Sequence, residues 1–285
     1  MKLLYLGTAA AEAIPALFCE CEACQKARSL GRAGIRGRAG SLVDGVLKID
    51  FGPDSYRQML DNGLSYAKIH SLLITHTHED HLAVDEVALR RQVTAHIHTE
   101  PKLMTVYGNA AVGEKLRGKT GEMLAFSEIK PFVSYDIEGY TVTPLDAVQC
   151  CTADGSDFPV ICRGKLYHRS ENALIFLIEK DGKRLLYAHD TDELTTEDLS
   201  FLRGKHLDLV SLDCTNGVLR STWTGHMGAD RDKLTRQALR DFGAADEKTI
   251  FVANHFSHNG FPGEEELQRE LPGFLISHDG MEIEF

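Results

Sequence analysis

Short apolar runs separated by polar turns dominate the first reading of the chain. Runs of this length that carry β-branched and aromatic residues predict buried strands. Asp44-Gly45 and Asp181-Gly182 each lie between two apolar runs and predict hairpin turns. The predicted strands cover residues 2–6, 41–50 with a turn at Asp44-Gly45, 69–75, 94–98, 140–144, 173–178, 184–188, 207–212, 249–253 and 274–277.

Amphipathic segments alternate with these strands. They predict helices at residues 20–30, 54–62, 84–92, 193–203, 231–242 and 264–271. This order favours an α/β (α+β) fold, with two antiparallel-rich sheets packed together and covered by helices. No linker rich in Pro, Gly or Ser divides residues 1–285, so we expect a single domain. The one break in the pattern, residues 147–167, predicts an irregular insertion.

Composition and charge narrow the function classes. The apolar share of 43% supplies enough material for a core and argues against disorder. The net charge of -11 makes a polynucleotide a poor partner, although a small anion bound at a local positive centre stays compatible. The apolar opening is broken by Gly7, Thr8 and Glu12, and no long hydrophobic stretch follows. We therefore expect a cytoplasmic protein without a membrane partner.

Three thiols lie close together near the start of the chain. Cys19, Cys21 and Cys24 are soft ligands that supply most of a tetrahedral metal site, which requires four donors. In a reducing compartment such clusters bind metal more often than they form disulfides. The alternatives are free thiols or a site completed by another residue such as Cys214. Three further cysteines belong to no motif and are interpreted as structural or redox-sensitive thiols: Cys150, Cys151 and Cys162.

A second set of donors follows the apolar run at residues 72–75. His76 and His78 are two positions apart, so their imidazoles point to one side of an extended segment. Asp80 and His81 come from the turn that follows and can present a second group of ligands. This concentration of donors suits two adjacent metal ions better than one; the alternative is a polar turn with chance histidines.

The HxHxDH motif formed by these residues resembles that of the metallo-β-lactamase superfamily. Together with CxCxxC near the N-terminus and a late HxSH, it is similar to the PhnP-type phosphoribosyl 1,2-cyclic phosphate phosphodiesterases. Further similarities occur at residues 143–145 (TPL), 212–214 (LDC) and 279–285 (DGMEIEF), so the resemblance spans nearly the whole chain. It implies a four-layered αβ/βα sandwich, and a homodimer would fit this family.

The resemblance also implies the metal ligands. Asp190 would bridge two ions, with His189, its neighbour on the opposite side of the strand, more suited to packing or hydrogen bonding. The family spacing points to Gln149 for one ligand, which is not a histidine, so a lengthened segment at residues 147–167 would displace this role to His168. The complete set is His76, His78 and His168 on one ion, Asp80, His81 and His255 on the other, Asp190 between them, and Cys19, Cys21, Cys24 and His258 on a structural zinc.

The expected activity is hydrolysis of a small cyclic phosphate or phosphodiester. Two ions, Zn, Mn or Fe(II), would turn a bridging water into the nucleophile. Asp80, as a ligand, and His226, as general acid or phosphate contact, are the candidate catalytic residues; a surface-loop histidine is the alternative for His226. A small phosphorylated molecule is the expected substrate.

Two other functions compete with this one. The first is another hydrolase of the same superfamily, such as a transfer RNA 3′-processing nuclease or a lactone or thioester hydrolase. The acidic charge argues against the nuclease. The second is a non-catalytic protein of cofactor biosynthesis similar to PqqB, which shares the CxCxxC element. Complete retention of the HxHxDH donors argues against it, because burying so many unpaired ligands without a metal is costly.

Overall fold

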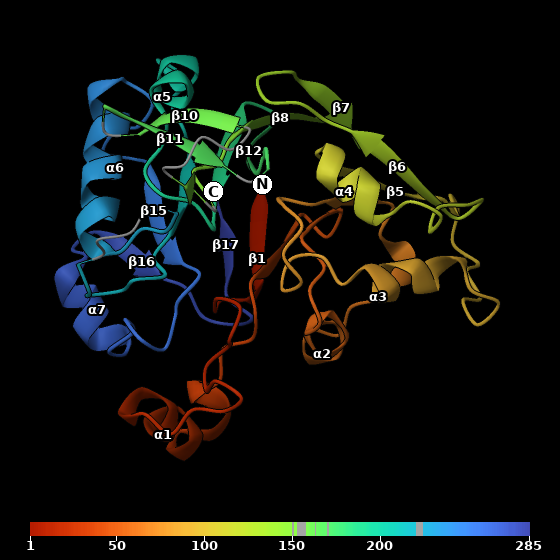
Figure 1. The fold of residues 1–285 in the computed structure, drawn as a ribbon, viewed down its shortest axis with the longest axis horizontal. Coiled ribbons are helices and arrows are strands. Elements are labelled where there is room, and N and C mark those ends of the chain that lie inside the picture. Colours follow the sequence, from red (N-terminus) through yellow and green to blue (C-terminus); the bar gives the residue numbers. More distant parts are fainter. Residues whose placement is uncertain (150, 153–157, 163, 170, 221–224) are drawn as a thin grey trace.

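The computed structural model describes residues 1–149, 151–152, 158–162, 164–169, 171–220 and 225–285, with the backbone alone at 151, 152, 158, 160, 162 and 167–169 (Figure 1). The strands are β1 (Lys2–Gly7), β2 (Gly40–Val43), β3 (Leu47–Ile49), β4 (Ser71–Leu73), β5 (Met104–Gly108), β6 (Leu124–Glu128), β7 (Tyr135–Ile137), β8 (Tyr140–Asp146), β9 (Cys151–Thr152), β10 (Phe158–Cys162), β11 (Lys165–Arg169), β12 (Leu174–Lys180), β13 (Lys183–Ala188), β14 (Leu209–Asp213), β15 (Ile250–Asn254), β16 (Phe274–Ile276) and β17 (Glu282–Glu284). The α-helices are α1 (Glu22–Ser29), α2 (Ser55–Asp61), α3 (Val84–Ala88), α4 (Ala110–Lys115), α5 (Thr196–Leu202), α6 (Ala229–Asp241) and α7 (Glu264–Glu270).

Two mixed sheets of seven strands form the centre of the fold. The first has the order β17-β1-β2-β3-β4-β5-β6, and the second β16-β15-β14-β13-β12-β8-β7. Strands β3 to β6 run parallel in the first sheet, as do β13 to β16 in the second. The remaining pairs in both sheets are antiparallel.

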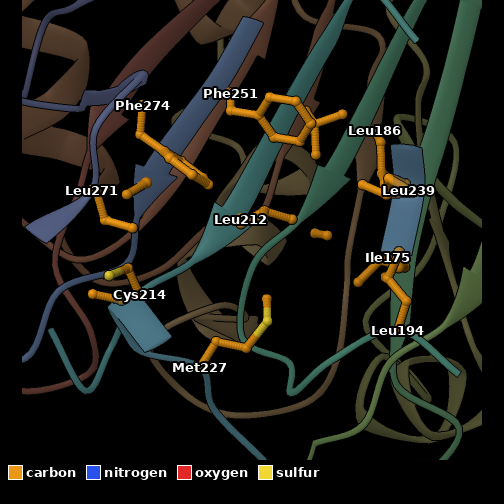
Figure 2. Close-up of a cluster of buried hydrophobic side chains, with 14 of the residues drawn as sticks. Ile175, Leu186, Leu194, Leu212, Cys214, Met227, Leu239, Phe251, Leu271 and Phe274 are labelled. Atoms are coloured by element: carbon orange, nitrogen blue, oxygen red, sulfur yellow. The ribbon is translucent and has the colours of Figure 1, made fainter. Parts of the chain in front are cut away.

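Strand β12 shows how the sequence specifies the layers. Its residues Leu174, Phe176 and Ile178 point into the core between the two sheets. The intervening Ile175 and Leu177 point to the other face, in the cluster that also contains Phe251 and Leu212 (Figure 2). A strand buried on both faces has a continuous apolar sequence because successive side chains alternate between the faces.

Helices cover both outer faces. Leu202 of α5, Leu239 of α6 and Leu267 of α7 pack on the second sheet, and these helices lie on the left in Figure 1. On the opposite side, Val87 of α3 and Val112 of α4 pack with the first sheet. This arrangement is the four-layered αβ/βα sandwich that we expected. Helix α1 stands apart from the layers, below them in Figure 1.

The predicted strand at residues 94–98 is wrong. These residues lie in turns and loops, and the alternation that suggested a strand leaves Ala95 and Ile97 only half-buried. A strand needs a partner for its backbone groups as well as an alternating pattern. The first sheet instead continues through β5 and β6, which we did not predict, and α4 and β17 were also missed.

The segment at residues 147–167 is more regular than predicted. Strands β9, β10 and β11 form a separate small sheet there. Cys150 lies outside the described residues, as do the side chains of Cys151 and Cys162, so their predicted roles stay untested.

Within the part of the chain that the structure describes, no helix is both long and apolar enough to cross a membrane.

Candidate metal centre

The predicted donors meet where parallel strands of the two sheets end. His76 follows β4, Asp190 follows β13 and His255 follows β15, and Asp50, which was not predicted, follows β3. The carboxyl ends of parallel strands share one edge of a sheet, which is where ligands bind in open α/β sheets. Three of these residues have a left-handed backbone, with φ of 58° at Asp50, 52° at Asp190 and 63° at His255. Such conformations are rare outside glycine and concentrate at functional sites.

The imidazoles converge on one carboxylate oxygen. The Nε2 atoms of His76 and His81 each lie 3.1 Å from Asp190 Oδ2, and His255 Nε2 lies 3.9 Å from it. Asp80 Oδ2 adds a second carboxylate 3.1 Å from His81 Nε2. Asp190 is therefore the centre of the cluster.

The other ring nitrogen of each histidine is tied to an oxygen behind it. His81 Nδ1 lies 2.7 Å from a carboxylate oxygen of Asp50, which can only accept a proton. The hydroxyl groups of Thr215 and Thr75 each donate a hydrogen bond to a carboxylate. Their oxygens can therefore accept a hydrogen bond from Nδ1 of the neighbouring histidine. These distances are 2.7 Å for His255 to Thr215 and 3.0 Å for His76 to Thr75.

This arrangement favours one tautomer and fits a metal. With Nδ1 as the donor to the oxygen behind each ring, Nε2 is the nitrogen that would coordinate an ion. Among the residues that the structure describes, these three buried Nε2 atoms make no hydrogen bond: His76, His81 and His255. Nitrogens held this way from behind are typical of metal-ligating histidines.

Besides a group with Asp213, His226 and His255, two groups of donors share Asp190. Asp80, His81 and His255 form one group with it, and the donor atoms lie within 4.8 Å of one another. His76 and His78 form the other group with Asp190, by the same criterion. The resemblance implied these two groups with His168 added to the second.

Gln149 lies at the place where a further ligand of the second group was expected. Its Nε2 is 3.2 Å from Asp190 Oδ1 and 3.4 Å from His78 Nδ1. The backbone of His168 lies in β11, opposite Thr152 of β9. The side chain of His168 is outside the described part of the chain, so its assignment stays a prediction.

Opposite charges dominate the electrostatics of the centre. Burial raises the pKa of Asp190, but the surrounding imidazoles, His226 foremost, outweigh burial and hold it well below its ordinary value. Burial also raises the pKa of Asp213, but the positive charge of His226 outweighs burial and lowers this pKa to about 2. Both carboxylates are therefore ionised at neutral pH and can neutralise cations.

His226 lies beside the cluster rather than in a remote surface loop. Its Nδ1 is 3.1 Å from Asp213 Oδ2 and 3.2 Å from Asp190 Oδ1, and its ring stacks on that of His255 at 5.8 Å. Burial lowers the pKa of His226, but the carboxylates of Asp190 and Asp213 more than offset this and raise it to about 9. Nε2 is left as the nitrogen that can face a ligand.

The cluster opens into a pocket of about 670 Å³. Its lining includes His78, Asp80, Gln149, His226 and Glu12. This volume lies in the range of small-molecule sites, which is roughly 300–1,000 Å³.

The predicted thiol site also comes together. Cys19, Cys21, Cys24 and His258 place their donor atoms within 4.8 Å of one another. His258 Nδ1 lies 3.4 Å from Cys21 Sγ and 3.6 Å from Cys19 Sγ. A hydrogen bond from the Cys24 backbone, then one with His258, lowers the pKa of Cys21 to about 6, which favours the thiolate that binds metal.

Several supporting residues escaped the sequence analysis. Glu171 accepts hydrogen bonds from the backbone N–H of Thr77 (3.1 Å) and from the side chain of Asn109 (3.0 Å). It therefore holds Thr77, which lies between His76 and His78 in the chain. Asp50 and Asp213 come directly at the end of apolar strands, the same signal that identified Asp190. That position could have identified both.

His189 has the hydrogen-bonding role expected for it. It is buried, with Nε2 2.6 Å from Ser211 Oγ and Nδ1 3.1 Å from Asn254 Nδ2. Its ring lies 3.9 Å from that of Tyr187, in the core between the sheets.

Comparisons with known proteins support the fold. The family described as Beta-lactamase superfamily domain matches residues 46–256. The structure of a diphosphatase from the PhnP family is 23% identical, with a TM-score of 0.71 over 100% of this chain and 96% of that one. Zn²⁺-bound PqqB from Methylobacterium extorquens is 20% identical, with a TM-score of 0.74 over 100% of both chains. Human tRNase Z, short form, is 15% identical, with a TM-score of 0.62 over 100% of this chain and 99% of that one.

No curated protein matches the sequence.

Proposed function

The chain belongs to the β-lactamase superfamily, and from this premise we propose that it is a metal-dependent phosphodiesterase acting on a small cyclic phosphate or a similar small diester. The observation that carries the proposal is the shared orientation of His76, His81 and His255. Each ring places Nδ1 within hydrogen-bond distance of an oxygen behind it and directs Nε2 to Asp190.

The donor set fits two divalent ions. His76, His78 and Asp190 would hold one, and Asp80, His81, His255 and Asp190 the other. Ions bound there supply an activated water and neutralise the charge of a phosphoryl group. Mixed imidazole and carboxylate donors suit Zn, Mn or Fe(II). The thiol cluster, with soft donors and a single imidazole, suits a structural zinc.

The protein itself provides the proton for the leaving group. His226 borders the pocket, and its Nδ1 faces Asp213 and Asp190. These carboxylates stabilise the imidazolium and hold its ring in place. Nε2 can then donate to a leaving alkoxide, as general acid catalysis requires.

Pocket size and charge favour a small substrate. The pocket of about 670 Å³ suits one small molecule. The net charge of -11 opposes the binding of a polynucleotide. A diphosphatase among the structural neighbours is an example of phosphoryl chemistry in this fold.

A substrate panel with parallel metal analysis tests the proposal. The purified protein, supplied with zinc or manganese, is assayed on cyclic and linear phosphodiesters, a lactone and a thioester. We expect turnover of the small phosphodiesters. The Asp190→Ala protein, purified in the same way, should be inactive, which controls for contaminating hydrolases.

Two outcomes would contradict the proposal. Turnover of the lactone or the thioester alone would indicate a different hydrolase of the superfamily. The absence of any turnover, with no metal bound outside the thiol cluster, would favour a non-catalytic protein similar to PqqB.

A further inference from the structure

The two groups of donors around Asp190 are unequal. The group of Asp80, His81 and His255 has two carboxylates, counting Asp190, and its two imidazoles are almost completely buried. The group of His76 and His78 has only the shared carboxylate, and His78 is exposed. More anionic donors and less access for water both favour tighter binding of a cation. We call these groups the deep site and the outer site.

Gln149 is held at the outer site by the loop that carries Asp190. The backbone N–H of Asp192 donates to the carbonyl of Val148 at 3.0 Å. In return, the N–H of Val148 donates to Thr191 Oγ1 at 2.8 Å. The adjacent Gln149 is 4% exposed, so its amide is not a mobile surface group. Its position is thus coupled to that of Asp190.

The end of the Gln149 side chain occupies the position of a ligand. Gln149 Nε2 donates to Asp190 Oδ1 at 3.2 Å and lies 3.4 Å from His78 Nδ1, that is, between donors of the outer site. Rotation of the amide by half a turn exchanges its nitrogen and oxygen without moving the rest of the side chain. The oxygen can therefore face a cation from this position.

We propose that the amide oxygen of Gln149 completes the outer site in place of a third imidazole, which makes it the weaker of the two sites and less selective for zinc. The inference rests on the proposed ion pair. A neutral amide oxygen is a harder ligand than imidazole and suits Mn²⁺ or Mg²⁺ better than Zn²⁺. The deep site fills first, and the outer site fills at higher metal concentration.

His168 is the competing donor for the same position. Its backbone pairs with Thr152, three residues after Gln149 along the chain. The experiment must therefore change both residues separately.

Metal binding, measured without substrate, tests the proposal. The central ions are removed with a weak chelator, and one retained zinc per chain shows that the thiol cluster is intact. Zn²⁺ and Mn²⁺ are then titrated against a competing chromophoric chelator, with electron paramagnetic resonance to detect coupled Mn²⁺ pairs. The proteins compared are wild type, Gln149→His, Gln149→Leu and His168→Ala.

We expect two binding events of unequal affinity in the wild type. Gln149→His should increase the Zn²⁺ affinity of the weaker binding event by about ten-fold or more. Mutation of a residue that only hydrogen-bonds to a ligand already changes metal affinity by about this factor, so a change of the ligand itself should do at least as much. Gln149→Leu, which keeps the size of the side chain, should weaken that event and abolish the coupled Mn²⁺ signal. The tighter event should be unchanged in both variants, which also shows that they fold.

Three results would overturn the inference. The first is equal affinity of the two binding events in the wild type. The second is a Gln149→Leu protein whose weaker binding event has the wild-type affinity. The third is loss of the weaker binding event in His168→Ala while Gln149→Leu retains it. None of these depends on turnover. A failed substrate panel with unequal metal binding would refute the phosphodiesterase and leave this inference standing.

Discussion

The two clusters of metal donors in this protein are built in opposite ways. The thiol cluster takes three donors from one short segment, Cys19 to Cys24, and a fourth from His258. The central cluster collects its donors from the ends of strands in both sheets. Three thiols and one imidazole supply the four donors of a closed tetrahedral site, whereas the central donors open into the pocket. The difference is the one expected between a structural metal site and a site that can accept a substrate.

The clusters also differ in what lies behind their histidines. His81 has the buried carboxylate of Asp50 at 2.7 Å, whereas His258 Nε2 has the partly exposed Glu12 at 3.8 Å. A short hydrogen bond in a buried environment is worth more than a distant, solvated pair.

Asp190→Ala should have the largest effect. It removes the carboxylate shared by both central groups, so we expect loss of both central ions and a fall in kcat/KM of at least about 10³-fold. Zinc in the thiol cluster should be retained, as measured by metal analysis. Glu122→Ala, which removes an exposed carboxylate, is the control and should change neither quantity. Retention of a full complement of central ions in Asp190→Ala would show that Asp190 does not bridge.

His226→Ala should reduce turnover without removing metal. The imidazole borders the pocket but belongs to neither proposed ion group, so we expect kcat to fall by about 10²- to 10⁴-fold. Metal content should stay near that of the wild type. A loss of metal in this variant would mean that His226 is itself a ligand.

Asp50→Asn should weaken the central cluster selectively. The amide keeps the shape of the side chain but loses the charge that fixes the His81 tautomer, so we expect the affinity for the deep ion to fall about 10- to 100-fold. Chelator competition measures this change. The matched change behind the thiol cluster, Glu12→Gln, should alter zinc affinity there much less. Equal losses in the two variants would remove the contrast between the clusters.

Cys21→Ser should have the smallest effect on catalysis. We expect loss of the thiol-bound zinc, a change in kcat of only a few-fold, and a Tm lower by about 5 °C or more. Added zinc should restore the Tm of chelator-treated wild type but not that of the variant. Loss of the central ions as well would show that the two clusters fold as one unit.

The sequence predicted the donors better than the residues that orient them. His76, His78, Asp80 and His81 are adjacent in the chain, and their spacing alone indicates a metal site. Asp50 ends an apolar strand, which marks it as a candidate, but its contact with His81 and that of Thr215 with His255 join strand ends that are distant in the sequence. Their roles depend on which strands lie side by side.

The same limit applied to the fold. The apolar run of β12 predicted a buried strand because both of its faces are covered. Residues 94–98 alternate like a strand, yet they lie in turns and loops, whereas β5 and β6 were overlooked. Alternation of apolar and polar residues shows only that a segment could have one buried face. Whether it pairs with another strand depends on distant parts of the chain.

The central claim is that a shared carboxylate, Asp190, holds a pair of ions apart from the thiol-bound zinc. Equilibrium dialysis against saturating zinc, followed by elemental analysis per chain, tests it most directly. The account predicts about three ions in the wild type, two in Cys21→Ser and one in Asp190→Ala. A wild type that never exceeds two ions, with Asp190→Ala losing only one of them, would contradict it.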